Sequence, residues 1–249
     1  MNPEDLKLAG VIGGGVMGGG IAQVLATHGF NVVVKDINED VLAHTRETVI
    51  NGRYGLKRGL ERGKLSKEQM DAAIGLMRFS TRDEDLVEAD LIIEAIPEDL
   101  ELKKKTFSEL DKKVNPEALF ASNTSGFSIV SLAGAVERKD RFMGMHWFSP
   151  VPVMKLIEII WTPDATEESI LFLEELGRKL GKITIRVKDA EDKYGFVANR
   201  IYYAMVAESQ RVLEEGIASM EDINNAMKYG YNWPAGPFEL MLATKKGWQ

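Results

Sequence analysis

The first part of the chain alternates between short apolar runs and segments whose apolar residues recur at helical spacing. Short apolar, β-branched runs predict strands, and the helical spacing predicts amphipathic helices. The predicted strands are Lys7–Ile12, Asn31–Lys35, Met77–Ser80, Asp90–Ala95, Ala118–Ser122, Phe142–His146, Lys155–Trp161 and Lys182–Lys188. Strands that alternate with helices are typical of a mainly parallel sheet covered by helices on both faces. We therefore expect an α/β fold with a doubly wound sheet.

Helices are predicted between these strands. Val16–His28 carries apolar residues at helical spacing, and Asn38 is a suitable N-cap for the next helix. From about residue 46 to 74 a charged, helical insertion separates the second strand from the third. Within it, Ser66 and Gln69 have the spacing of a capping box, in which each side chain accepts a backbone N–H of the other residue.

A polar, charged segment at Asp189–Lys193 predicts a domain boundary near residue 190. Residues 1–190 form the predicted doubly wound domain, and residues 191–249 show helical spacing only. About 60 residues are few for an independent domain, because a small domain buries a smaller share of its surface. We expect a small, all-helical C-terminal domain.

Composition narrows the class of protein. The formal charge of −7 argues against nucleic acid as a partner, since nucleic-acid binding usually leaves a basic surface. The chain has no cysteine, which excludes disulfides and thiolate chemistry. It shows neither a signal-peptide pattern nor an apolar run that approaches the length of a membrane span. We expect a cytoplasmic protein with no membrane partner.

A glycine-rich segment follows the first predicted strand and opens the first predicted helix. It matches the pattern G-x-G-x-x-G, which includes Gly13, Gly15, Val16, Met17 and Gly18. The first glycine permits a tight turn, the second admits a pyrophosphate close to the backbone, and the third allows close helix–strand packing. Asp36 ends the second strand, where a carboxylate binds the ribose 2′-hydroxyl of NAD and repels the 2′-phosphate of NADP. This context favours a Rossmann-type NAD site over a glycine loop that serves packing alone.

His146 and Glu158 are candidates for acid–base chemistry. The chain has three histidines, and this one lies between an apolar run and a Ser-Pro turn. Glu158 interrupts a run that otherwise resembles a buried strand, and a carboxylate buried alone costs several kcal/mol. A carboxylate that accepts the histidine N–H holds the ring in one tautomer, so that the other ring nitrogen acts as a base. The alternative is a glutamate at a solvent-exposed edge and a histidine satisfied in the core.

Further polar residues follow the predicted strands. Ser125 follows the fifth strand, and Glu98 and Lys103 follow the fourth. Ligands bind outside the carboxyl ends of the strands in a doubly wound sheet, so these residues face the predicted cofactor cleft. Turn residues or solvated charges are the alternative for all three. Asn199, in the first helix of the C-terminal part, lies either in a polar pocket between the domains or on the surface.

Five segments together resemble the 3-hydroxyacyl-CoA dehydrogenase family, in order and in spacing, over nearly all of residues 5–240. They are Val11–Ala22, Ile93–Lys105, Ala121–Ser125, His146–Glu158 and Gly195–Arg200. The resemblance implies NAD-dependent oxidation of a (3S)-3-hydroxyacyl-CoA to the 3-ketoacyl-CoA, and the reverse reaction. It also implies an acyl-CoA substrate, and a homodimer if the C-terminal domain is complete.

The resemblance assigns roles to individual residues. His146 is the general base for the substrate 3-hydroxyl, oriented by Glu158, and no metal takes part. Ser125 and Asn199 hydrogen-bond near the reacting oxygen and hold the substrate. The residues implied to contact NAD, besides the glycine segment and Asp36, are Glu98, Lys103, Ser125 and Ser149.

Two arginines and three departures from the family pattern complete the expectations. Arg58 and Arg62 fall where the family places basic residues near the CoA phosphates, with a solvated run of helical charges as the alternative. Ser149 replaces a usual Asn and, having the shorter reach, weakens or hydrates a nicotinamide or substrate contact. Tyr194 replaces a usual proline, which loosens the hinge into the C-terminal domain. The chain ends at Met241–Gln249, where the family continues with further helices, so the resemblance implies a shortened, incomplete C-terminal domain over residues 191–249.

Two other functions fit the same sequence. A dehydrogenase on this scaffold can oxidise a different hydroxy acid, such as a sugar acid, and the basic residues favour a CoA thioester only weakly. A truncated chain can bind NAD without turnover, and cofactor binding without turnover of any hydroxyacyl-CoA would identify it. The chain can also be one module of a multifunctional β-oxidation protein.

Overall fold

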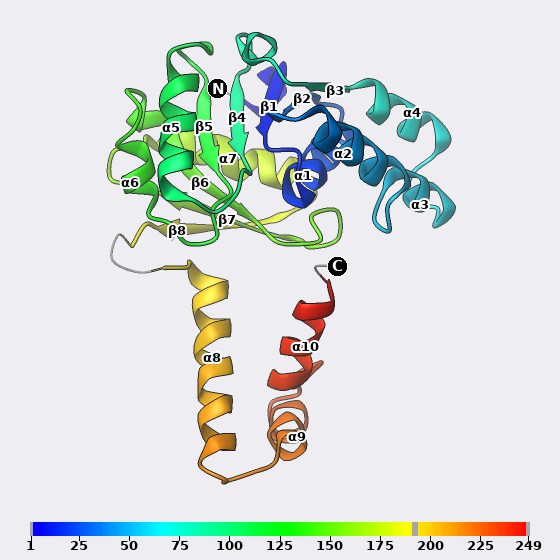
Figure 1. Cartoon of the computed structure of the whole chain (residues 1–249), viewed down its shortest axis with the longest axis vertical. Helices are drawn as coiled ribbons and strands as arrows, with labels where there is room; N and C mark the ends of the chain where they lie inside the picture. Colours follow the sequence, from blue (N-terminus) through cyan, green and yellow to red (C-terminus); the bar gives the residue numbers. More distant parts are fainter. Residues whose placement is uncertain (1, 191–193, 248–249) are drawn as a thin grey trace. The chain divides into compact units, whose positions relative to one another are not determined.

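The computed structural model describes residues 2–190 and 194–247, the last five of them by their backbone only. Two compact units, Met1–Tyr194 and Gly195–Gln249, make up the chain (Figure 1). Residues 191–193 of the predicted linker lie outside the described residues. The doubly wound sheet falls in the first unit and the C-terminal helices in the second.

One eight-stranded sheet forms the centre of the first unit, with the strand order β3-β2-β1-β4-β5-β6-β7-β8 (Figure 1). The strands are β1 (Leu8–Ile12), β2 (Asn31–Lys35), β3 (Met77–Ser80), β4 (Leu91–Glu94), β5 (Leu119–Ser122), β6 (Phe142–Trp147), β7 (Leu156–Trp161) and β8 (Ile183–Lys188). Each strand begins and ends within one residue of its predicted bounds. The predicted α/β fold is confirmed.

The direction of the strands changes once across the sheet. All neighbours from β3 to β6 are parallel, β6 and β7 are antiparallel, and β7 and β8 are again parallel to each other. The carboxyl ends of the first six strands therefore lie at one edge of the sheet. The beginning of β7 lies at that edge as well.

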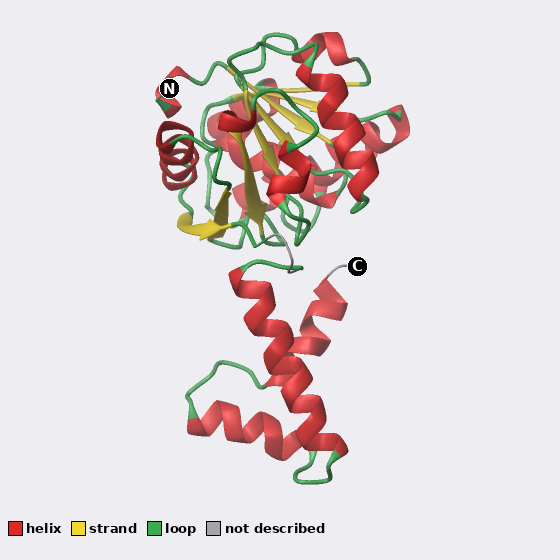
Figure 2. Cartoon of the chain, turned by 90° about the vertical axis from the view of Figure 1, so that its left-hand side faces the viewer, coloured by secondary structure: helices red, strands yellow, loops and turns green. Residues whose placement is uncertain are grey.

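Helices cover both faces of this sheet (Figure 2). They are α1 (Val16–Thr27), α2 (Glu39–Asn51), α3 (Leu56–Glu61), α4 (Lys67–Gly75), α5 (Leu100–Asp111), α6 (Ile129–Ala133) and α7 (Glu167–Lys179), with short 3₁₀ helices η1 (Pro3–Asp5), η2 (Asp83–Leu86) and η3 (Lys139–Arg141). The predicted capping box begins α4: the Gln69 backbone N–H donates to Ser66 Oγ at 3.2 Å, and the Ser66 backbone N–H donates to Gln69 Oε1 at 2.8 Å.

Alternation along the strands sends side chains to two separate cores. Met143 and Met145 of β6 belong to the core that includes α1 and α7. On the opposite face, Phe107 of α5 packs against Phe142 of β6 with ring centroids 4.7 Å apart. Successive residues of a strand point to opposite faces, so His146 shares the α5 face with Phe142.

The second unit contains α8 (Val197–Glu214), α9 (Met220–Gly230) and α10 (Pro237–Gly247). The Lys228 ammonium lies 2.7 Å from the Glu239 carboxylate, and the Phe238 backbone N–H donates to Asn224 at 3.0 Å, so α9 and α10 are joined. The described residues of this unit contain no strand, as predicted. None of the helices in the described part of the chain is both long and apolar enough to cross a membrane.

Candidate active site

The glycine segment forms the turn from β1 into α1. Gly13 has a φ of +100°, which L side chains rarely adopt, and a Cβ there would lie 2.6 Å from the Ala95 carbonyl oxygen. A Cβ at Gly15, the N-cap of α1, would meet no protein atom within 4 Å, so its backbone faces open space. A Cβ at Gly18 would collide with the Gly13 carbonyl oxygen. These are the tight turn, the open approach and the close packing that a dinucleotide loop requires.

Asp36, directly after the neighbouring strand β2, stabilises this turn. Its Oδ2 accepts a 2.7 Å hydrogen bond from the Gly14 backbone N–H, and the buried Thr45 hydroxyl donates to the Gly14 carbonyl. Val16 and Met17 begin α1, and the first N–H groups of a helix, which have no intrahelical acceptor, attract phosphate. A phosphate site beside a carboxylate that can accept ribose hydroxyls fits NAD.

The carboxyl ends of β4 and β5 carry a connected polar cluster. Glu98 Oε1 accepts hydrogen bonds from Thr124 Oγ1 at 2.5 Å and from the Ser125 backbone N–H at 3.0 Å. Two predicted site residues from different loops, Glu98 and Ser125, are thus brought into direct contact.

Lys103 is buried rather than solvated, so the alternative interpretation of this residue is wrong. Its side chain is 1% exposed, and its Nζ lies 2.5 Å from Glu94 Oε1 and 3.2 Å from Glu98 Oε2. Glu94, the last residue of β4, is completely buried and was not among the predicted site residues. A signal for it exists in the sequence, because it ends an apolar strand in the way that Glu158 interrupts another.

His146 and Glu158 form a buried pair between adjacent strands. They are opposite each other in the antiparallel β6–β7 register, and His146 Nδ1 lies 2.7 Å from Glu158 Oε2. The residues are 3% and 0% exposed, so the alternative of a glutamate at a solvent-exposed edge is wrong. Since an ionised carboxylate only accepts hydrogen bonds, the ring proton belongs on Nδ1 and Nε2 is the basic nitrogen. Such a pair can take up a proton and stabilise the resulting imidazolium.

The loop between β6 and β7 is held by Lys182. The Lys182 ammonium donates to the Val151 and Met154 carbonyls at 2.6 and 2.7 Å. Burial lowers the pKa of the Lys182 ammonium to about 8. Ser149 lies in the same loop, partly buried, before a cis bond to Pro150. Sequence reasoning missed Lys182, because a lysine at the beginning of a strand resembles an ordinary surface charge.

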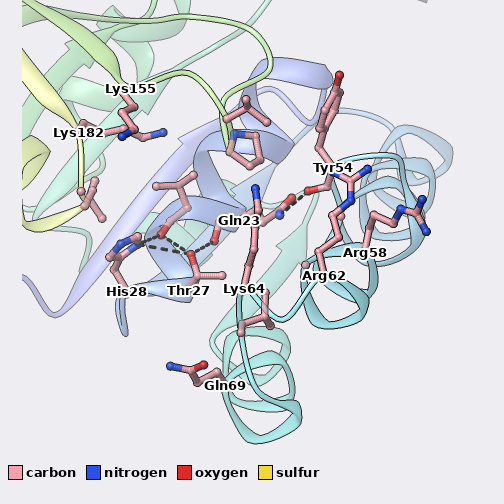
Figure 3. A pocket seen from close by; sticks show the side chains of 18 of the residues that line it. Gln23, Thr27, His28, Tyr54, Arg58, Arg62, Lys64, Gln69, Lys155 and Lys182 are labelled. Carbon is pink, nitrogen blue, oxygen red and sulfur yellow. Dashed lines mark hydrogen bonds between the residues drawn. The ribbon is translucent and has the colours of Figure 1, made fainter.

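Arg58 and Arg62 line a groove of about 540 Å³ in the first unit, called here the basic groove. Its other arginine and lysine residues are Arg53, Lys64, Lys155 and Lys182. Figure 3 shows Lys155 and Lys182 on one side of α1, with Arg58 and Arg62 on the other. Among the described residues that line the groove, none is acidic. The loop that connects β6, the strand of His146, to β7 lines this groove with Pro152, Val153 and Lys155.

Two predicted residues flank the division between the units. Tyr194 ends the first unit, where its ring packs edge-on against Phe127 at 6.1 Å. Asn199 is in the first turn of α8 in the second unit and is partly buried. The loosened hinge at Tyr194 stays a prediction.

A fold that places a dinucleotide loop and a buried proton acceptor at the same edge of one sheet can transfer a hydride and a proton together. That chemistry defines an NAD-dependent dehydrogenase. Within this class, the chain belongs to the 3-hydroxyacyl-CoA dehydrogenase family: the NAD binding domain of the family matches residues 8–190, and its C-terminal domain matches residues 195–247. It is an oxidoreductase whose cofactor is NAD.

Named relatives agree with this assignment. The mitochondrial hydroxyacyl-coenzyme A dehydrogenase of Homo sapiens is 41% identical over 239 residues, which cover 95% of this chain and 75% of that protein. The 3-hydroxybutyryl-CoA dehydrogenase of Bradyrhizobium diazoefficiens is 41% identical, with 94% and 78% covered. The crystal structure of (S)-3-hydroxybutyryl-CoA dehydrogenase from Ralstonia eutropha superposes with a TM-score of 0.88 at 40% identity, covering 93% and 80%.

Proposed function

We propose that this chain oxidises the 3-hydroxyl of a (3S)-3-hydroxyacyl-CoA to the 3-ketone with NAD, and catalyses the reverse reduction. The buried His146–Glu158 pair at the carboxyl edge of the NAD-binding sheet carries the proposal. Family membership supplies the substrate class, since both mammalian and bacterial relatives are named as dehydrogenases of hydroxyacyl-CoA or hydroxybutyryl-CoA.

In this mechanism His146 acts as the general base. Its Nε2 takes the proton of the 3-hydroxyl while the C3 hydrogen leaves with its electron pair and the C–O bond becomes a carbonyl. NAD, when bound, accepts that hydride. Glu158 stabilises the imidazolium that forms, because a buried carboxylate is little screened by water. In the reverse direction, protonated His146 donates the proton to the ketone oxygen.

The remaining site residues bind and orient. Ser125 and Asn199 hydrogen-bond the substrate near its reacting oxygen, and Glu98, Ser125 and Ser149 contact the cofactor. The Lys103 ammonium lies 3.2 Å from the Glu98 carboxylate. This contact supports a role for Lys103 in holding Glu98 in position.

The basic groove takes the phosphates of the CoA nucleotide. Its guanidinium and ammonium groups match phosphate in charge, and a guanidinium also matches its geometry. A sugar acid has no such distant phosphates, so the groove favours the thioester over that alternative. Arg58 also forms an exposed ion pair with Glu61 at 2.6 Å, so a substitution of Arg58 would change two interactions. Arg62 is therefore the better residue with which to test phosphate binding in the groove.

Arg62→Gln should raise the KM for acetoacetyl-CoA about fivefold with kcat unchanged, because one exposed charge contact is worth roughly 1 kcal/mol. The KM for the corresponding pantetheine thioester, which lacks the nucleotide, should not change. Steady-state kinetics with both substrates measures the difference. Lys67→Gln is the matched control, since Lys67 is an exposed α4 cation, paired with Asp71, that does not line the groove. Equal KM changes for the two thioesters would contradict the phosphate assignment.

The function itself is tested by NADH oxidation with acetoacetyl-CoA, using the purified 249-residue chain. We expect rapid turnover with NADH and much slower turnover with NADPH, because the Asp36 carboxylate repels a 2′-phosphate. NADH binding measured by fluorescence, without turnover, would instead support an NAD-binding module without activity. Turnover of a sugar acid but of no thioester would support the other alternative. The homodimer and the cytoplasmic location stay predictions from the sequence.

A further inference from the structure

A completely buried ion pair lies behind the predicted cofactor contacts. Glu94 and the Lys103 side chain are 0% and 1% exposed, and their Oε1 and Nζ atoms are 2.5 Å apart. Glu94 Oε1 also accepts from the Ile96 backbone N–H at 2.8 Å, and Oε2 accepts from the Ser122 hydroxyl at 2.6 Å. Burial raises the pKa of the Glu94 carboxyl, while Lys103 and Ser122 oppose that change.

Stability alone does not explain such a pair. Removing two charges from water costs about as much as their attraction returns, so buried pairs are often replaceable by apolar residues without loss. Buried polar groups can instead specify one local arrangement. A role for this pair is therefore to be sought in the groups that it holds in position.

The pair connects the interior of the sheet to Ser125. Lys103 Nζ lies 3.2 Å from Glu98 Oε2, and the other oxygen of Glu98 accepts the Thr124 hydroxyl and the Ser125 backbone N–H. Lys103 is thus shared between two carboxylates, Glu94 on the buried side and Glu98 on the side of the site.

We propose that Glu94 is a positioning residue for the dehydrogenase reaction: by sharing the Lys103 ammonium it leaves Glu98 in place to hold the Ser125 loop. This inference rests on the proposed function, in which Ser125 contacts substrate and cofactor. Nothing in the family match or in the named relatives assigns a role to Glu94.

Removing the Glu94 charge changes how Lys103 is shared. In Glu94→Gln the amide fills the same space, but Glu98 becomes the one carboxylate beside the Lys103 ammonium among the described contacts. The stronger attraction draws Glu98 away from Thr124 and Ser125. In Glu94→Gln/Lys103→Met that attraction is gone, so the second substitution should restore part of what the first removes.

The experiment combines amide hydrogen exchange with kinetics. Glu94→Gln should speed exchange at least tenfold in the peptide that carries Ser125 and lower kcat/KM roughly 10- to 100-fold, the range of contacts coupled in one network. The isotope effect with NADH deuterated at nicotinamide C4 should rise, because a misplaced substrate slows the chemical step. The double variant should have a kcat/KM at least as high as that of Glu94→Gln and no faster exchange at Ser125.

Asp111→Asn is the matched control. Asp111 is a partly buried carboxylate 2.5 Å from Arg138, whose guanidinium donates to the carbonyls of Asn115 and Ala118, at the opposite edge of the sheet. It should lower the melting temperature without changing the isotope effect or exchange at Ser125. Glu94→Asp, which keeps the charge but shortens the side chain, should show a smaller loss in the same direction and serves if Glu94→Gln does not fold.

The outcomes separate this inference from the function on which it rests. A wild-type chain that binds NADH but does not turn over acetoacetyl-CoA would contradict the proposed function. Amide exchange at Ser125 would still show whether Glu94 positions the Ser125 loop. The inference is overturned if Glu94→Gln leaves that exchange and kcat/KM within twofold of wild type. It is also overturned if the variant behaves as Asp111→Asn does, or if the two substitutions act additively.

Discussion

The His146→Gln variant should lose about two to four orders of magnitude in kcat, the contribution typical of positioned proton transfer. Glutamine keeps polar atoms near the same place but has no group that can take up a proton near neutral pH. NADH affinity should stay within about threefold of wild type, because the glycine turn and Asp36 follow other strands, β1 and β2, and keep their hydrogen bonds.

Steady-state kinetics with acetoacetyl-CoA and a fluorescence titration with NADH test this expectation together. His44→Gln is the control, because His44 is an exposed histidine on α2 that takes no part in the site. A His146→Gln enzyme that kept a tenth or more of its turnover would show that another group is the base. Loss of NADH binding together with turnover would point to a folding defect.

Glu158→Gln should lower kcat by a similar factor, about 10² to 10⁴. Either orientation of the new amide weakens the base. With its NH₂ toward Nδ1, the amide needs an acceptor there, so the ring proton moves to Nε2 and the base is lost. With its oxygen toward Nδ1, the tautomer is kept but the charge that stabilises the imidazolium is gone. The 2.7 Å contact in a buried site leaves little room for water to replace that charge.

Turnover, NADH affinity and melting temperature should be measured on the same preparation of this variant. Glu174→Gln is a suitable control: Glu174 is a partly buried carboxylate that pairs with Arg186 at 2.9 Å. Arg186 and other neighbours hold the pKa of Glu174 low, against the effect of its burial. The control should lower stability while keeping kcat. Comparable kcat losses in the two glutamine variants would mean that Glu158 serves the fold rather than the chemistry.

His146 and Glu158 show what the local sequence pattern predicts and what it does not. Glu158 is conspicuous because a carboxylate inside an apolar strand must have a partner, and His146 is one of three histidines. Their pairing, however, depends on β6 and β7 being antiparallel, so that residue 146 meets residue 158. A parallel or shifted register would have left the same two residues apart.

Lys103 and Glu94 show the opposite case. A lysine followed by further lysines predicts a solvated helix, and only the packing of α5 against the sheet buries it beside Glu94. The basic groove is similar, since Arg62 and Lys182 are far apart in sequence and line one cavity only because α1 lies between the elements that carry them.

Strand and helix periodicity, the glycine spacing and the acidic end of the second strand are properties of neighbouring residues, so they could be predicted along the chain. They were sufficient for the strands, the doubly wound sheet and the choice of NAD as cofactor. The reversal of β7 and β8, the buried Glu94–Lys103 pair and the basic groove required the folded chain. Each depends on which elements pair and in which direction, and those contacts join residues whose separation in sequence carries no periodic signal.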